Sequence, residues 1–189
     1  RDDAAGIEAA ARRERQRIFA GLDADFLLTA HQQDDQAETL LLQLLRGAGP
    51  KGLAAMAELH HRPDWRAAQL RPLLGVTRAG VRAYAQANGL AWVDDESNQD
   101  TRYRRNALRQ RVMPLLAAHF PGSGSTLARA AALQADAAEL LDDLAQLDAV
   151  RAIDGSRLDC RVLADLSAAR ARNLLRFFIE QHGQPMPNA

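Results

Sequence analysis

The sequence of 189 residues is poor in several residue types, and each shortage excludes a class of protein. Its single cysteine excludes a disulfide framework and a cysteine-built metal site. Aromatic residues make up only 5% of the chain, and alanine and leucine carry the apolar fraction, which favours helices over a β-rich fold. No apolar run is long enough to span a membrane, and no signal peptide opens the sequence. We therefore expect a cytoplasmic protein without membrane contact.

The sequence also lacks net charge, and Lys51 is its only lysine. A formal charge of +0 provides no bulk attraction to nucleic acid. GC-rich coding explains a general preference for arginine, whose planar fork of donors suits phosphate and carboxylate. It does not explain the crowding of arginines in one stretch, which predicts a local positive patch: Arg102, Arg104, Arg105, Arg109 and Arg111.

Strands and helices are predicted to alternate along the first two thirds of the chain. Apolar periodicity and turn residues predict four helices. They lie at 4–20, from the end of the first strand to about residue 46, at 77–88 and at 103–119, and Pro114 is expected to kink the last one. Strands are expected at 25–30, 69–74 and 90–93, the first buried on both faces. The alternation indicates an α/β layer with a parallel sheet.

The last third has a different organisation. A linker is predicted at 121–125, followed by one long helix at 126–150, a short strand at 156–160 and a helix at 167–182. We therefore expect an α/β domain at 1–120 and a mostly helical region at 121–189.

The densest polar cluster follows the strand predicted at 25–30. At about 100° per residue, His31, Asp34, Asp35 and Glu38 fall within one arc of the next helix. A solvated acidic first turn, favoured by the helix dipole, is one interpretation. A metal site is a second, and a pocket for a cationic amine, or for Mg²⁺ held with nucleotide phosphates, is a third. The residues alone leave these alternatives open.

Two basic segments are further candidates. Residues 46–53 form a glycine-rich stretch without P-loop spacing, and we expect it near the acidic cluster, where Arg46 and its backbone amides meet an anion. Arg105 and Arg109 are four residues apart and therefore share a helix face, which suits phosphate of ATP or of an RNA backbone.

Taken together and in order, six segments closely resemble the tRNA(Ile)-lysidine synthetase family of PP-loop ATPases. They are residues 6–12, 31–39, 46–53, 71–74, 95–98, and 105–109 with 114–116. The resemblance covers about the first two thirds of the chain. It implies part of a doubly wound parallel sheet of the PP-loop ATPase (adenine nucleotide alpha hydrolase-like) type, followed by the start of a helical tRNA-binding domain.

The resemblance also implies an activity. Members of the family are ligases that form a carbon–nitrogen bond between L-lysine and the wobble cytidine of isoleucine tRNA with a CAU anticodon. ATP activates the cytosine carbonyl, the lysine amine expels AMP, and lysidine and pyrophosphate are the other products. The implied partners are ATP, Mg²⁺, L-lysine and isoleucine tRNA, and a homodimer is an open alternative for the assembly.

The family's functional residues are matched here by position. The resemblance implies that Asp35 and Glu38 hold the lysine amine and that Arg12 and Arg105 lie near the reacting centre. His31, Asp34 and Arg109 are implied as supporting residues. We expect tRNA or nucleotide contacts from Arg46 and Lys51, and we predict no resident metal site.

One departure from the family pattern matters. The signature Ser-Gly-Gly-x-Asp-Ser, which grips ATP, is absent, and we expect it upstream of Arg1. This chain alone is therefore expected neither to bind ATP tightly nor to catalyse. The alternatives are a PP-loop tRNA thiolase, disfavoured by the single cysteine, a metal-dependent phosphohydrolase, and a non-catalytic RNA-binding module.

Overall fold

The computed structural model describes residues 3–93 and 99–184, with the backbone alone for residues 3–5, 7–9 and 12. The chain divides into two compact units, Arg1–Leu133 and Gln134–Ala189. Helix α7 (Ser123–Ala152) contributes residues to both units. None of the described helices is long and apolar enough to cross a membrane.

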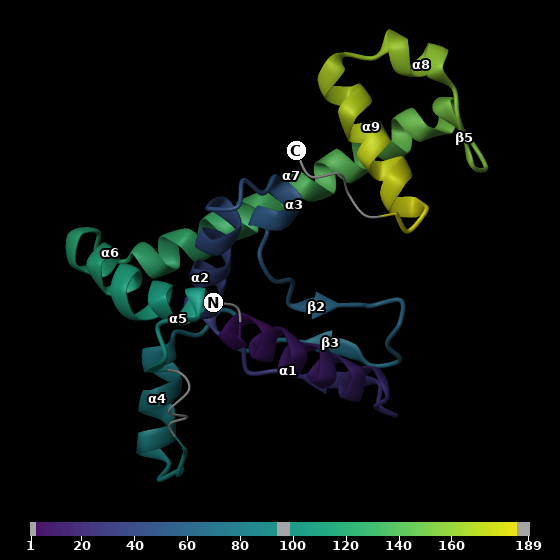
Figure 1. Cartoon of the computed structure of the whole chain (residues 1–189). Coiled ribbons are helices and arrows are strands. Elements are labelled where there is room, and N and C mark those ends of the chain that lie inside the picture. Colours follow the sequence, from purple (N-terminus) through teal and green to yellow (C-terminus); the bar gives the residue numbers. More distant parts are fainter. Residues whose placement is uncertain (1–2, 94–98, 185–189) are drawn as a thin grey trace. The chain divides into compact units, whose positions relative to one another are not determined.

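The first unit alternates helices and strands as the sequence predicts (Figure 1). Its elements before α7 are α1 (Asp3–Ala20), β1 (Phe26–Leu28), α2 (Gln33–Leu44), α3 (Pro50–Leu53), β2 (Leu59–His60), β3 (Ala68–Leu70), α4 (Arg78–Ala87), α5 (Arg104–Ala107), the π-helical turn η2 (Leu108–Val112) and α6 (Met113–His119). The helix predicted at 77–88 is confirmed as α4, and Thr77 caps it: its side chain accepts a hydrogen bond from the Gly80 N–H at 3.0 Å.

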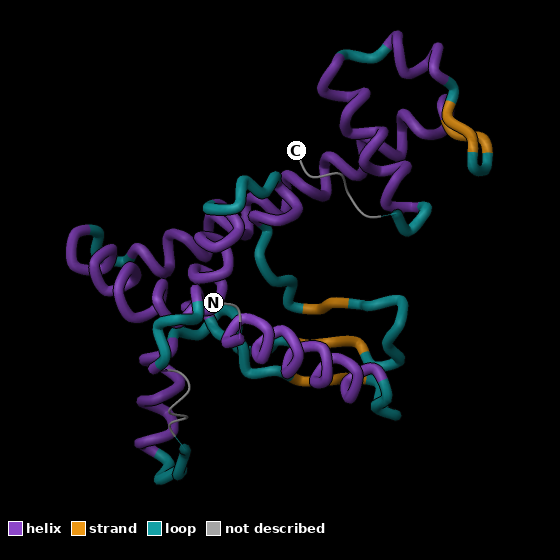
Figure 2. The backbone as a smooth tube through the Cα atoms, viewed as in Figure 1, coloured by secondary structure: helices purple, strands orange, loops and turns teal. Residues whose placement is uncertain are grey.

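The strands of the first unit form a small mixed sheet in the order β1-β3-β2 (Figure 2). β1 and β3 are parallel, with Phe26 opposite Ala68, which confirms the predicted α/β class. β2 pairs with β3 in the antiparallel direction, and the sequence did not reveal this strand. The carboxyl ends of β1 and β3 lie at one edge of the sheet, where the Thr29 N–H donates to the Leu70 carbonyl at 2.9 Å.

Two strand predictions are wrong. β1 is not buried on both faces, since Phe26 is 56% and Leu28 62% exposed. Their side chains point to the same face of the sheet, where more than half of each is exposed. The strand predicted at 90–93 does not form, because no described strand lies beside it to pair with its backbone, and Trp92 and Val93 are exposed.

The linker predicted at 121–125 is shorter than expected. Helix α7 already begins at Ser123, and Gly122 forms the turn before it with a φ of +80°. The domain boundary predicted at residue 120 stays a prediction, because the compact units divide inside α7.

The second unit is mostly helical, as predicted. Beyond α7 it contains a hairpin of β4 (Ile153–Asp154) and β5 (Arg157–Leu158), then α8 (Cys160–Asp165) and α9 (Ala168–Gln181). Leu174 of α9 is fully buried, and the Arg170 Nε donates to the buried Asp148 of α7 at 3.1 Å. The Asn173 side chain donates to the Leu141 carbonyl at 2.6 Å, which fixes α9 against α7.

Candidate active site

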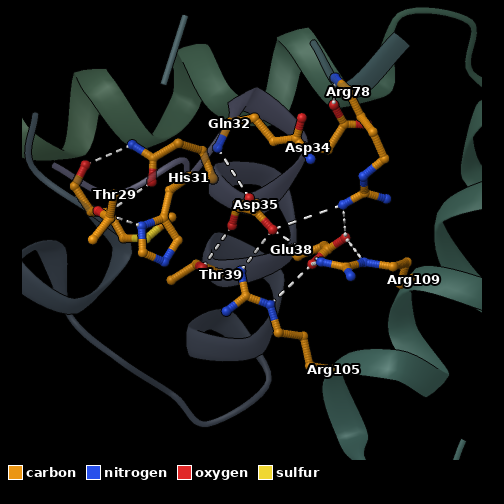
Figure 3. Close-up of polar contacts among 12 residues, drawn as sticks. Thr29, His31, Gln32, Asp34, Asp35, Glu38, Thr39, Arg78, Arg105 and Arg109 are labelled. Carbon is orange, nitrogen blue, oxygen red and sulfur yellow. Dashed lines mark hydrogen bonds and ion pairs between the residues drawn. The ribbon is translucent and has the colours of Figure 1, made fainter. Parts of the chain in front are cut away.

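Two carboxylates on the first turns of α2 form the centre of the candidate site (Figure 3). Asp35 and Glu38 are three residues apart and therefore lie on one side of the helix. Only 9% of Asp35 and 1% of Glu38 is exposed. The Oδ2 of Asp35 accepts a hydrogen bond from the Gln32 N–H at 3.0 Å, which satisfies a backbone donor where the helix begins.

Three arginines from α4, α5 and η2 surround these carboxylates. The Arg109 Nε lies 2.7 Å from Glu38 Oε1, and its Nη2 lies 2.8 Å from Glu38 Oε2 and 3.0 Å from Asp35 Oδ1. The Arg105 Nε lies 3.1 Å from Glu38 Oε2, and its Nη2 lies 3.2 Å from Asp35 Oδ1. The Arg78 Nη2 is more distant, 3.3 Å from Glu38 Oε1 and 3.8 Å from Asp35 Oδ1. The bidentate Arg109–Glu38 pair is therefore the firmest contact.

Two of these arginines come together where α5 continues into a π-helical turn. Arg105 belongs to α5 and Arg109 to η2, where the Met113 N–H bonds to the Leu108 carbonyl five residues back. Pro114 follows at once; it has no N–H to donate to the carbonyl four residues before it, so the regular helical ladder is interrupted here. The predicted distortion at Pro114 and the predicted shared direction of Arg105 and Arg109 are confirmed.

The carboxylate oxygens of Glu38 have no acceptor capacity left. Each oxygen accepts about two hydrogen bonds, and Oε1 and Oε2 together receive one donor from Arg78, one from Arg105 and two from Arg109. A divalent cation would have to compete with three guanidinium groups. Among residues 3–93 and 99–184, no group of three or more His, Cys, Asp or Glu side chains could hold a metal ion. The arrangement disfavours the phosphohydrolase alternative.

The charge balance at the site fixes the ionisation of Glu38. Burial alone would raise the pKa of this carboxyl, but hydrogen bonds and charge from Arg109 and then Arg105 outweigh burial and lower the pKa below its ordinary value. Glu38 in turn raises the pKa of Arg109 through its hydrogen bonds. Both groups are therefore charged at neutral pH.

This lowered pKa predicts a pH-dependent stability. Because the pKa of Glu38 is lower in the folded state than the unfolded value of about 4.3, its contribution is complete above the unfolded value and is lost as the pH falls through the folded value. We expect the urea midpoint, followed by tryptophan fluorescence, to fall below about pH 4, and to fall less in Glu38→Gln. An equal fall in both proteins would contradict the assignment.

Arg78 is the candidate that the sequence did not reveal. It is the first residue of α4, and its backbone N–H donates to Asp34 Oδ2 at 2.7 Å while its guanidinium reaches Glu38. The positive N-terminal end of α4 thus meets the acidic turn of α2. The sequence contains an indirect indication of this contact, because it predicts that α4 follows a strand. In a parallel sheet the helices that follow neighbouring strands begin at the same edge.

His31 does not join the carboxylates. It lies before Gln33, the first residue of α2, so the predicted arc holds for Asp34, Asp35 and Glu38 but not for His31. Its Nδ1 lies 3.0 Å from the Thr29 Oγ1, away from the carboxylates (Figure 3). Burial lowers the pKa of His31, which favours the neutral ring at pH 7.

The remaining predicted residues lie elsewhere. Arg12 belongs to α1, but its side chain is outside the described residues, as is the whole of segment 95–98. Arg46 follows the C-terminal end of α2, and Lys51 belongs to α3, which packs against α2. The expectation that segment 46–53 adjoins the acidic cluster stays a prediction; just beyond this segment, the Met56 carbonyl and N–H bond to the side chain of Gln36, the neighbour of Asp35, at 2.7 and 2.9 Å.

A cavity of about 290 Å³ opens beside the cluster. Its lining comprises Asp34, Glu38, Arg78, Arg109, Met113, Pro114, Ala117, Ser123 and Gly124. Ser123 and Gly124 begin α7; the Ser123 N–H donates to the Phe120 carbonyl at 3.0 Å, and the positive end of the helix dipole favours a negative group at this turn. The buried Oγ of Ser123 has no hydrogen-bond partner among the described residues. Acidic and basic groups together suit a zwitterion of amino-acid size.

Models of known protein families match two parts of the chain, an α/β part followed by a part near the C-terminal end. The PP-loop domain family model matches residues 1–116. The TilS substrate binding domain model matches residues 158–189.

Several curated relatives match nearly the whole chain. The tRNA(Ile)-lysidine synthase of Azoarcus sp. (strain BH72) is 49% identical over 187 residues, which is 99% of this chain and 42% of the relative. The enzymes of that name from Pseudomonas aeruginosa and Nitrosomonas europaea are 49% and 46% identical over 93% and 97% of this chain. The chain spans about two fifths of the length of these relatives.

Proposed function

The chain belongs to the PP-loop domain family, and from this premise we propose that it is part of an ATP-dependent ligase that joins L-lysine to the wobble cytidine of isoleucine tRNA with a CAU anticodon. The observation that carries the proposal is the buried pair Asp35 and Glu38, surrounded by arginines at the carboxyl edge of β1 and β3. Parallel sheets of this class bind their ligands at that edge.

The proposed reaction requires two kinds of charged group. In the first step the cytosine carbonyl oxygen is adenylated and pyrophosphate leaves; in the second, the lysine amine attacks the activated carbon and AMP leaves. Carboxylates stabilise the ammonium of lysine, and a carboxylate oxygen that an arginine has released can accept a proton when the amine becomes a nucleophile. Guanidinium groups stabilise the negative charge on the phosphates and on departing AMP. We assign the first task to Asp35 and Glu38 and the second to Arg105 and Arg12.

The ion pairs of the structure suggest how lysine enters. Because Glu38 has no acceptor left, an ammonium can bind it only by replacing a guanidinium. Arg109 holds the shortest contacts, whereas Arg105 and Arg78 lie at 3.1–3.8 Å. We propose that lysine displaces one of these two weaker partners, which leaves the local charge unchanged. A released Arg105, already 36% exposed, is then available to a phosphate.

The cavity beside the cluster accommodates the rest of the amino acid. Asp34 and Glu38 provide negative groups at one part of its wall, and Arg78 with the first turn of α7 provides donors for a carboxylate. Its volume of about 290 Å³ leaves room for an amino acid of the size of lysine. Arg109 stays paired with Glu38 and supports the wall, and His31 supports the turn that precedes α2.

Cofactor and partners complete the proposal. The described residues form no site for Mg²⁺ alone, so we propose that Mg²⁺ enters with the phosphates of ATP. The exposed Arg46 and Lys51 are proposed as tRNA contacts. A cytoplasmic location and assembly as a homodimer belong to the same proposal.

The proposal is tested with the full-length protein, unmodified isoleucine tRNA transcript, ATP, Mg²⁺ and labelled lysine. We expect label in the tRNA only when ATP is present, and none in a matched transcript whose wobble cytidine is replaced by uridine. AMP release upon tRNA addition without lysine incorporation would contradict the proposal and indicate a PP-loop enzyme with another nucleophile, such as a thiolase.

A further inference from the structure

A second cavity, also about 290 Å³, shares Arg78 with the first as a lining residue. Its lining comprises Gln32, Arg78, Val81, Arg82, Ala85 and Trp92. Four of these residues have the spacing i, i+3, i+4 and i+7 on α4, so they form one face of that helix. The chain turns at Gly89, which adopts a φ of +63°, and returns along this face to place Trp92 at the cavity.

The chemistry of this cavity combines an aromatic ring with two cations. Trp92 is 48% exposed, so part of its ring is accessible to a ligand. Arg78 and Arg82 are four residues apart and lie on the same helix face. Arg78 is held by Glu38, so its charge is fixed at the cavity. Ring and guanidinium groups side by side match the base and the phosphate of a nucleotide.

We propose that this cavity binds one unpaired nucleotide of the RNA substrate, adjacent to the nucleotide that reacts. The base stacks on Trp92, its phosphate lies between Arg78 and Arg82, and the Gln32 side-chain amide donates to or accepts from the base edge. The inference rests on the proposed function and deepens it, because it assigns a place to the RNA. Arg78 lines both cavities, so the bound nucleotide and the lysine lie on either side of one guanidinium.

The chain provides its own reporter for this contact, since it has two tryptophans. Trp65 packs against Phe19 with ring centroids 5.8 Å apart and lines neither cavity. In Trp65→Phe the fluorescence comes from Trp92 alone, and in Trp92→Phe it comes from Trp65 alone. We expect an RNA anticodon stem-loop with a CAU anticodon to quench Trp92 saturably and to leave Trp65 unchanged. Sodium triphosphate, which offers charge without a base, should quench neither.

Affinity provides the second measurement, by fluorescence anisotropy of labelled stem-loop. We expect Trp92→Ala to raise the Kd about tenfold, while Trp92→Phe, which keeps a ring, restores most of the affinity. Circular dichroism of both variants shows whether the helices are intact, and Trp92→Phe keeps the test valid should Trp92→Ala unfold.

Two results would overturn the inference. One is an unchanged Kd in folded Trp92→Ala, as expected of a tryptophan that serves a protein partner. The other is equal quenching by triphosphate and by RNA. The assay needs neither ATP nor lysine, so its failure leaves the ligase proposal standing. Quenching by RNA in a protein whose full-length form incorporates no lysine would overturn the ligase proposal alone.

Discussion

Replacing Glu38 by glutamine is expected to lower the free energy of unfolding of the first unit by about 3 kcal/mol. The substitution keeps the shape of the side chain but removes the charge that compensates Arg78, Arg105 and Arg109. Glu38 is 1% exposed, so little water is available to replace it. Urea unfolding followed by fluorescence reports on this unit, because Trp65 and Trp92 both belong to it.

The matched control is Glu58→Gln, which removes the same charge at an exposed position of the same unit. We expect this control to change the free energy of unfolding by less than about 0.5 kcal/mol. A loss below about 1 kcal/mol in Glu38→Gln would show that the three arginines are compensated by solvent, and the central place of Glu38 in this unit would be wrong.

Replacing Arg105 by alanine is expected to lower the kcat for lysine incorporation by about 100-fold or more in the full-length protein. Arg105 is the most exposed of the three arginines, and Arg109 still compensates both carboxylates without it. The loss should therefore fall on catalysis more than on folding. The measurement is the initial rate of label incorporation at saturating lysine, ATP and tRNA.

Arg104→Ala is the control for this prediction. Arg104 is the neighbouring residue on α5, carries the same charge and is exposed. We expect it to change the KM for tRNA at most, through the general attraction of a cation for RNA. Equal losses of kcat in both variants would show that Arg105 acts only as part of a basic surface.

The sequence was informative where local geometry decides the outcome. Residues three and four apart on a helix must share a face, so the pairs Asp35–Glu38 and Arg105–Arg109 were predicted as units. Pro114 cannot continue the hydrogen-bond ladder, so a distortion before it was also predictable. None of these features depends on the rest of the fold.

Contacts between distant segments were beyond the sequence alone. Arg78 and Glu38 are forty residues apart, and their contact depends on how α4 follows β3. The place of segment 46–53 likewise depends on how α3 packs against α2. The apolar run 90–93 resembles a strand, but a strand also needs a neighbour to pair with. The family resemblance supplied the expected reaction together with Arg105 and Arg109, but it gave neither Arg78 nor the pairing of all three arginines with Glu38.

The central claim is that lysine replaces a guanidinium at Asp35 and Glu38, and its most direct test is the dependence of the rate on lysine concentration in Asp35→Asn. Asp35 is a better position than Glu38 for this substitution, because Asp35 receives fewer arginine contacts. We predict that the KM for lysine rises about tenfold or more, while the KM for tRNA is unchanged. An unchanged KM for lysine with a reduced kcat would contradict the claim, since the carboxylates would then serve only to hold the arginines.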